Sequence, residues 1–545
     1  MNQNVISILL IILSINLNAQ SNLETKIDSI LDLNNVKELN PGVIISIVRD
    51  NNILVNKQRG LANLEYDVPL DDLTVFGVAS ITKQFTAACI GILSNEGKLD
   101  VNDDVRKYIP ELNFYSDTIK IKHLLNHTSG IRNHNVLLDL MGYDLNTNGY
   151  TNEIIEELMF KQKGVNNKPG AKVLYSNTNY VLLALIVKRV SKNDLATFAK
   201  SKIFNPLGMK NTFYRVNKSK IVKNRAYSYY KAGAGYEKAL SLNTCVGAGG
   251  LVTNVSDMAK WSLVYTDKKN PLYFLKDFLT VIEDSLVSES CARGVFVSNY
   301  KSRRCISHGG RDKGMRSHLV VLPEESLSIL VYTNTGGFNA ENISYQITDL
   351  FIKETDVNEV IERGKKDYGI KDLKRFVGLY QELNSDLKME IKLQNDTLFS
   401  KSSFSNQWTA IMRVGQQKFN RLNNENVSFN FSNNELNLSV SFSGAKFYFE
   451  KIELFEEDKI ELKDYVGVFY SEELDITYNL SQIENKLVLS YKNNDSLILK
   501  SGRKDEFGSG RRTLYTFKRN KEGKIIGFDV ASEGTVKGVD FVLVK

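Results

Sequence analysis

The chain has 545 residues, of which 42% are hydrophobic and 24% charged, a composition typical of a globular protein with more than one domain. Lys and Arg number 70 against 63 for Asp and Glu, and the resulting net charge of +7 is not gathered in a basic block, so nucleic acid is not expected as a partner. Four cysteines and five histidines do not support a disulfide-stabilised scaffold or a Cys/His metal domain.

The first residues form an apolar run from Val5 to Leu17, shorter than the roughly 20 residues that a membrane-spanning helix needs. Leu17 and Ala19 fit cleavage before Gln20, although residues 2–4 carry no Lys or Arg. We expect residues 1–19 to be a signal peptide, with an uncleaved anchor or a misread core segment as alternatives. The mature protein is then periplasmic or secreted and has no stable membrane span.

Residues 20–355 mix helical runs with short β-rich segments, which predicts one α+β domain. Within it, Ser80 and Lys83 stand three residues apart at the start of an apolar helix, so both lie on one helical face. A buried lysine there can take the proton of the serine, provided that its amine is neutral. The same spacing occurs in three other places, but only Ser80 opens a buried helix: Ser298/Lys301, Ser443/Lys446 and Ser501/Lys504.

Two further elements follow in chain order. Tyr175 and Asn177 stand two apart on a loop that enters an apolar helix, where they offer a phenol and an amide-binding group. His308-Gly309-Gly310 follows a strand-like segment, and its two glycines allow a substrate to hydrogen-bond along an edge strand.

Beyond a polar segment at 356–370, which is predicted to be a linker, the pattern changes to alternating strands. LKRFVGLY, starting at Leu373, reappears as LKDYVGVFY, starting at Leu462. Residues 371–455 and 460–545 are therefore predicted to be two β-rich units related by duplication, either tandem units or two halves of one barrel. A small barrel or lipocalin-like unit can hold a ligand, but we favour an interior filled by side chains.

In this order the three elements resemble the serine β-lactamase and penicillin-binding-protein superfamily, most closely class C β-lactamases with related DD-peptidases, esterases and aminopeptidases. Four further segments also resemble this superfamily: IKHLLNHTSGI at 121–131, PG at 169–170, IFNPLGMKNT at 203–212 and GAGGLVTNVSDMAKW at 247–261. The resemblance implies an antiparallel sheet flanked by helices, with a helical lobe.

The resemblance also implies a role for each site residue. Ser80 is the acylated nucleophile, and Lys83 and Tyr175 handle its proton. Asn177 binds the substrate amide, and His308, Gly309 and Gly310 form the substrate-binding strand. The backbone N–H groups of Ser80 and Arg311 form the oxyanion hole, and no cofactor or metal is implied.

The third element departs from the family's lysine-threonine-glycine strand. His308 has an ordinary pKa near 6.5 and is mostly neutral at neutral pH, while Gly309 lacks a hydroxyl. We therefore expect a peptidase- or esterase-like hydrolase of a small-molecule or peptide substrate, with weak or absent β-lactamase activity. The alternative is a slow-deacylating penicillin- or peptide-binding sensor.

The remaining candidates have structural interpretations. His123 and His127 have the spacing of a zinc helix but lack the glutamate after the first histidine, so they are expected to be capping or core residues. Cys291 and Cys305 flank a possible hairpin and could pair, although buried thiols are favoured. The β-units bind a ligand or partner, or they cover the cleft.

Overall fold

The structure is a computed structural model that describes residues 21–113, 115–145, 147–283, 287, 290–352, 370–422, 424–442, 445–453, 460–492 and 494–544. The expected signal peptide and nearly all of the expected linker lie outside these residues. Within the described ranges, no helix combines the length and the apolar character that crossing a membrane requires.

The N-terminal domain is built on a six-stranded antiparallel sheet in the order β10-β11-β12-β13-β1-β2. Both faces are covered, which explains why β1 is apolar on both faces apart from the buried Ser46 and the terminal Arg49. Val43, Ile45 and Ile47 pack with the helix at residues 21–33 and with α10, and Ile44 belongs to the core that contains α2. The strands are β10(Phe296–Tyr300), β11(Arg303–Asp312), β12(Met315–Leu322), β13(Leu327–Thr333), β1(Val43–Arg49) and β2(Asn52–Arg59).

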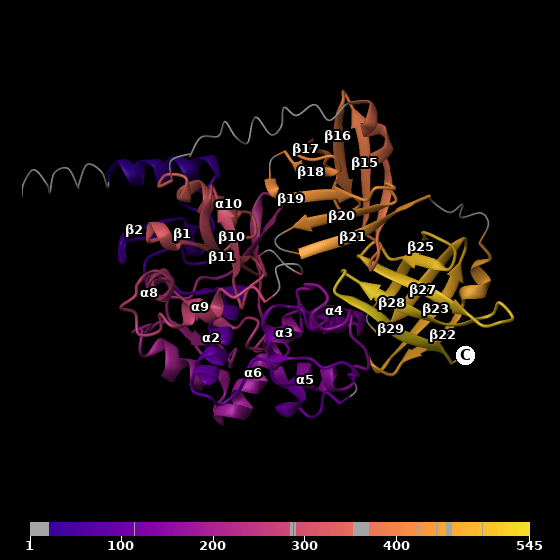
Figure 1. Cartoon of the computed structure of the whole chain (residues 1–545), viewed down its shortest axis with the longest axis horizontal. Helices are drawn as coiled ribbons and strands as arrows, with labels where there is room; N and C mark the ends of the chain where they lie inside the picture. The colour runs from indigo at the N-terminus through magenta and orange to yellow at the C-terminus, as the bar shows by residue number, and fades with distance from the viewer. Residues whose placement is uncertain are drawn as a thin grey trace, which may run out of the picture.

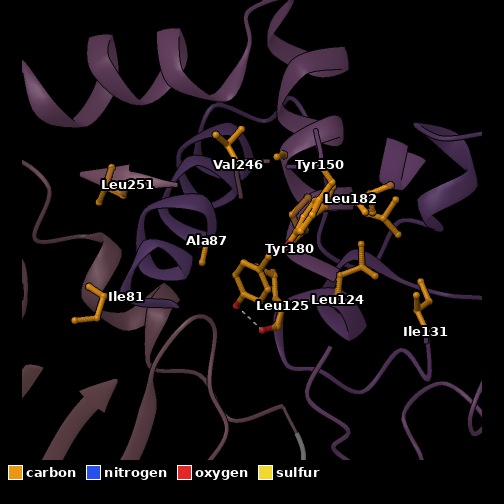
Figure 2. Packing of buried hydrophobic residues seen from close by; sticks show 14 of the residues in the cluster. Ile81, Ala87, Leu124, Leu125, Ile131, Tyr150, Tyr180, Leu182, Val246 and Leu251 are labelled. Carbon is orange, nitrogen blue, oxygen red and sulfur yellow. Dashed lines mark hydrogen bonds between the residues drawn. The ribbon is translucent and has the colours of Figure 1, made fainter. Parts of the chain in front are cut away.

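The helical part of this domain centres on α2(Thr82–Asn95) and α6(Asn177–Ser191), which pack against each other. Every residue of α2 from Thr82 to Leu93 is buried, so this helix is surrounded by protein on all sides. Figure 2 shows Tyr180 of α6 in this core, where its hydroxyl donates to the carbonyl of Leu125 at 2.8 Å. The other helices are α3(Ile121–Leu125), α4(His134–Leu140), α5(Asn152–Phe160), α7(Leu195–Ala199), α8(Val255–Thr266), α9(Leu275–Leu279) and α10(Ala340–Thr348).

Short strands connect these layers. β5(Phe76–Gly77), β9(Leu251–Thr253) and β6(Phe213–Tyr214) form a three-stranded sheet, and four further strands form two antiparallel pairs. These pairs are β3(Leu61–Asn63) with β4(Val68–Pro69), and β7(Tyr229–Ala232) with β8(Gly235–Lys238).

The C-terminal region forms two closed antiparallel barrels, so the repeat consists of two tandem units and not of two halves of one barrel. Barrel 1 comprises β14(Gly378–Glu382), β15(Lys388–Gln394), β16(Thr397–Ser402), β17(Thr409–Arg413), β18(Lys418–Arg421), β19(Asn424–Phe431), β20(Asn437–Phe442) and β21(Ala445–Ile452). Barrel 2 comprises β22(Gly467–Ser471), β23(Ile476–Ile483), β24(Lys486–Tyr491), β25(Asn494–Ser501), β26(Glu506–Gly508), β27(Thr513–Arg519), β28(Ile525–Ser532) and β29(Val536–Leu543).

Aromatic side chains occupy matching places inside the two barrels. In each, a short 3-10 turn precedes the first strand and contributes a buried ring, Phe376 or Tyr465. Phe376 packs against Phe419 and Phe431, and Tyr465 packs in the same way against two rings of barrel 2, Phe507 and Phe517. The duplicated motif is thus the entry turn and first strand of each barrel, with interior space occupied by these rings.

Barrel 2 (yellow in Figure 1) lies beside the helical part of the N-terminal domain, near α4 and α5. The Tyr478 hydroxyl donates to the carbonyl of Leu140 at 2.6 Å, and the Asn166 amide donates to the carbonyl of Thr535 at 2.7 Å. Apolar residues of barrel 2 belong to the same buried cluster as α2 and α6. This barrel therefore shares a core with the first domain.

Cys305 is a free thiol whose sulfur lies 4.0 Å from the Tyr345 hydroxyl. The sulfur of Cys291 contacts the carbonyl of Asn126 at 3.4 Å. The hairpin between these cysteines is formed by β10 and β11, as expected, but no Cys291–Cys305 disulfide closes it, and the favoured interpretation of buried thiols holds.

Candidate active site

Ser80 lies in a 3-10 turn, Ala79–Ile81, that leads directly into α2. Ala79 has a φ of 47°, a left-handed conformation that is costly for a residue with a Cβ atom. The turn is held from the sheet side, where the Ser317 hydroxyl donates to the carbonyl of Val78 at 2.9 Å. This support fixes the serine at the N-terminal end of α2, half-buried at the edge of a cleft.

The Lys83 side chain is fully buried beside Ser80. Its amine lies 3.0 Å from Ser80 Oγ, 2.9 Å from Asn177 Oδ1 and 2.9 Å from the carbonyl oxygen of Ala248. Burial lowers the pKa of this amine to about 7. The neutral form that a proton acceptor requires is therefore well populated at neutral pH.

Tyr175 and Asn177 lie where the chain enters α6, and both approach Lys83. The Lys83 amine is 4.9 Å from the centre of the Tyr175 ring. Burial raises the pKa of the Tyr175 phenol, and a hydrogen bond with Ser80 opposes that rise. Tyr175 therefore keeps its proton at neutral pH, so that Lys83 is the group of this pair that can accept one.

His127 is a site residue that the sequence did not identify. Its ring stacks on Tyr175 at 4.2 Å between ring centres, and its Nδ1 accepts a hydrogen bond from the Ser176 backbone at 3.2 Å. Burial, then the charge of Lys83, holds its pKa well below the usual value, so the ring stays neutral. Its spacing from His123 suggested only a metal or a structural role, because no local pattern links His127 to Tyr175.

His123 caps α3, where its Nδ1 accepts from the Lys120 backbone at 3.2 Å. Over the described ranges, no group of three or more His, Cys, Asp or Glu side chains is arranged to hold a metal ion.

The His308-Gly309-Gly310 segment lies in β11. β10 pairs with β11 only over Arg303–Ser307, so the backbone from His308 onward is open on that side. His308 is buried against Phe296, and its Nδ1 bonds to the carbonyl of Gly309 at 2.6 Å. Burial, with a smaller contribution from Lys83, lowers its pKa to about 3. His308 is therefore neutral across the physiological range and supplies no positive charge.

Gly310 allows β11 to approach the turn that carries Ser80. A Cβ atom at this position would lie 2.2 Å from the carbonyl oxygen of Val78 and 2.3 Å from Ser317 Oγ. At Gly309, in contrast, the nearest atom would be 3.5 Å away. The close approach at Gly310 holds β11 against the turn that carries Ser80, and Ser80 and Arg311 line the same cleft.

We expect Gly310→Ala to lower kcat/KM by about a hundredfold or more, because the added methyl group pushes β11 and the Arg311 N–H away from the reacting carbonyl. Gly309→Ala is the matched control and should keep the melting temperature of the parent protein. Steady-state kinetics and thermal unfolding of both variants check this prediction. Equal activity of Gly310→Ala and the parent would show that the strand does not supply a catalytic donor.

The turn at 247–250 lines the cleft through Ala248, Gly249 and Gly250. The carbonyl of Ala248 accepts from Lys83, and the carbonyl of Gly247 accepts from Thr86 Oγ1 at 2.8 Å. Gly247 has a φ of 116°, and a Cβ there would lie 2.3 Å from the carbonyl oxygen of Tyr180. Asp312 also lines the cleft.

Comparison with known protein families matches the N-terminal domain. The Beta-lactamase family model matches residues 33–349, more than half of the chain. Protein flp of Staphylococcus aureus (strain MRSA252) is 28% identical over 327 residues, which are 57% of this chain and 63% of that protein. D-aminopeptidase of Gluconobacter oxydans (strain 621H) is 26% identical over 298 residues, 54% of this chain and 56% of that protein. The match spans less than two thirds of each relative.

Solved structures share the fold at lower sequence identity. The octameric penicillin-binding protein homologue from Pyrococcus abyssi has a TM-score of 0.54 at 24% identity, covering 78% of this chain and 99% of that one. The D-amino acid amidase from Ochrobactrum anthropi SV3 has a TM-score of 0.51 at 20% identity, covering 61% of this chain and 99% of that one. With the family match over most of the N-terminal domain, the chain belongs to the beta-lactamase family.

Proposed function

We propose that this protein is a serine hydrolase that cleaves an amide or ester through an acyl-enzyme on Ser80. The observation that carries the proposal is the buried Lys83 amine, which has a pKa of about 7 and lies 3.0 Å from Ser80 Oγ. A serine hydroxyl is a weak nucleophile unless an adjacent base takes its proton. Similarity to a D-aminopeptidase favours an amide over an ester.

In the proposed reaction, Ser80 Oγ attacks the substrate carbonyl carbon and its proton moves to the neutral Lys83 amine. The oxyanion accepts hydrogen bonds from the N–H groups of Ser80 and Arg311. The bond to the leaving group then breaks, and the leaving amine or alcohol takes a proton delivered from Lys83 through the protonated Tyr175 phenol. Water then attacks the carbonyl carbon of the acyl-enzyme, and its proton moves to the neutral Lys83 amine. The ester bond to Ser80 breaks, the acid is released, and Lys83 returns the proton to Ser80 Oγ.

We further propose that β-lactams are poor substrates. The β11 strand carries neutral His308 and Gly309 in place of a cation and a hydroxyl, so neither of these two positions can hold a β-lactam carboxylate. The apolar run at residues 5–17 supports the additional proposal that the protein acts in the periplasm or outside the cell.

The test is to incubate the folded protein with a fluorescent fluorophosphonate and, separately, with a fluorescent penicillin, and to map the adducts by mass spectrometry. We expect the fluorophosphonate to label Ser80 and the Ser80→Ala variant to remain unlabelled. Ser298→Ala, which alters a serine with the same spacing to a lysine, is the matched control and should label normally. Stable labelling by penicillin without turnover of any ester or amide would favour the sensor alternative, and no labelling by either probe would contradict the proposal.

A further inference from the structure

Positive charge is concentrated in the segment that runs from α7 to β8. No Asp or Glu occurs between Asp194 and Glu237, whereas nine Lys or Arg do. Neutral residues separate these cations, so the sequence shows no compact basic block. Three of them lie in an exposed loop at 216–223, and within the described part of the chain none of the three forms an ion pair with a carboxylate: Lys218, Lys220 and Lys223.

The same loop exposes apolar side chains between its lysines. Ile221 is 88% exposed and Val216 is 56% exposed. Leu240, which directly follows the β7–β8 hairpin, is 57% exposed. Single exposed apolar residues are ordinary on a protein surface, but a group of them that lies together marks a surface that meets a partner or a membrane.

Arg215 holds the loop and the end of the hairpin together. Its guanidinium donates to the carbonyl of Lys218 at 3.0 Å and to that of Ser241 at 3.3 Å, so the loop lies next to Leu240. Arg215 and Ser241 also line the cleft beside Ser80. The exposed side chains named above therefore form one surface next to the cleft, here called the loop surface: Val216, Lys218, Lys220, Ile221, Lys223 and Leu240.

The hairpin beside the loop surface adds little net charge. Lys238 pairs with Glu65 at 2.7 Å. Glu237 and Lys231 are both exposed and carry opposite charges. The excess of positive charge therefore comes from the three lysines of the loop, which lie on either side of Ile221 in the chain.

We propose that the loop surface docks the protein on an anionic lipid bilayer. Ile221 and Val216 enter the interfacial layer, and the flexible lysine side chains reach the lipid head groups. Burial of apolar area and attraction to anionic lipid then act together. A soluble polyanion would attract the lysines but would not bury Ile221, and protein interfaces are depleted in lysine, so a membrane fits this surface better than either.

Docking goes beyond the proposed hydrolysis and does not depend on it. Because the loop surface adjoins the cleft, the docked protein holds the cleft beside the bilayer. The Ser80→Ala variant should bind membranes as well as the parent protein does. Loss of Ser80 labelling would therefore overturn the proposed function and leave docking standing, and loss of membrane binding would do the reverse.

The test is co-sedimentation of the mature protein with vesicles. Residues 1–19 are left out because the apolar run at 5–17 would itself bind lipid. We expect binding to vesicles of phosphatidylcholine with about 30% phosphatidylglycerol and none to phosphatidylcholine alone, and added salt should weaken it. The triple variant Lys218→Gln/Lys220→Gln/Lys223→Gln should lower the partition coefficient about a hundredfold, and Ile221→Ser about tenfold.

Matched variants remove the same groups elsewhere on the surface. Lys37→Gln/Lys268→Gln/Lys269→Gln removes three exposed charges, and Ile483→Ser removes an isoleucine that is 55% exposed on barrel 2. Both should bind vesicles like the parent protein, and all four variants should keep its melting temperature, because the altered side chains are exposed.

A polarity-sensitive fluorophore gives a second readout of the apolar contact. Attached to Ile221→Cys, it should shift to shorter wavelength when anionic vesicles are added, whereas the same label on Ile483→Cys should not shift. Absence of binding to anionic vesicles, or binding that is unchanged in both the triple lysine variant and Ile221→Ser, would overturn the proposal. Equal binding of the parent protein and Ile221→Ser, with full competition by soluble polyphosphate, would identify a polyanion site in place of a membrane site.

Discussion

Replacing Lys83 by methionine is expected to lower the rate of Ser80 acylation about a thousandfold, which is within the usual contribution of a positioned general base. Methionine keeps the unbranched shape that fills the buried site but cannot accept a proton. It also leaves Asn177 Oδ1 and the Ala248 carbonyl without their present donor. The second-order rate of fluorophosphonate labelling measures this effect on acylation alone.

The Lys83 amine also sets the pH dependence of Ser80 acylation. Only the neutral amine can accept the serine proton, and burial lowers the Lys83 pKa to about 7. The acylation rate of the parent protein should therefore rise with pH through an apparent pKa near 7 and level off above it, whereas the residual rate of Lys83→Met should lack this transition. His308 does not produce it, because its pKa of about 3 leaves it neutral throughout.

Lys301→Met is the matched control for this experiment. Lys301 has the same spacing to a serine, Ser298, but lies at the β10–β11 turn and pairs with Asp349 at 2.8 Å. Its replacement should leave both the labelling rate and the pH profile unchanged. The range from pH 6 to pH 8 extends about one unit on either side of the Lys83 pKa. An acylation rate of the parent protein that stays constant over this range would contradict the role of Lys83 as base.

Glu473→Ala is expected to destabilise the protein by about 3–5 kcal/mol, because it leaves the buried Arg132 guanidinium without its counter-charge. The Arg132 and Glu473 side chains are 3% and 9% exposed, and their closest N and O atoms are 2.5 Å apart. Arg132 also donates to the backbone carbonyls of Lys537 at 3.1 Å and Gly538 at 2.7 Å, both in barrel 2. Arg132 therefore contacts barrel 2 through the Glu473 carboxylate and two backbone carbonyls.

The loss should reach the active site through the backbone of Arg132. Its carbonyl accepts hydrogen bonds from the hydroxyls of Thr178 at 2.7 Å and Ser176 at 3.4 Å, which alternate along the chain with Tyr175 and Asn177. We therefore expect faster hydrogen exchange at 174–179 and a lower kcat/KM in Glu473→Ala, together with a lower urea midpoint.

The neighbouring Glu472→Ala is the control for this prediction. Glu472 pairs with Lys163, but their side chains are 74% and 49% exposed, so solvent screens the pair and the urea midpoint should change little. Equal urea midpoints and equal kcat/KM of the two variants would show that barrel 2 does not support the Tyr175 loop. The remaining interpretations would then be that the β-units bind a ligand or partner, or that they cover the cleft.

The sequence predicted those features that depend on neighbouring residues. Ser80 and Lys83 were separated from three decoys because the apolar pattern after Ser80 predicts a buried helix, and the open backbone after His308 followed from its glycines. The duplicated motifs predicted two β-units, which are two closed barrels. Each of these signals extends over a few turns of helix or one strand, where periodicity and backbone freedom are local properties.

Tertiary packing alone decided the rest. The pKa of Lys83 depends on its burial between segments that are far apart in the chain, and His127 reaches Tyr175 only because the loop before α4 folds back on α6. The Arg132–Glu473 contact likewise joins distant segments. Burial and electrostatic fields depend on everything that surrounds a group in space, so the sequence identified Ser80 and Lys83 as the candidate nucleophile and base, and the folded structure determined the ionisation of Lys83 and the contacts that support both residues.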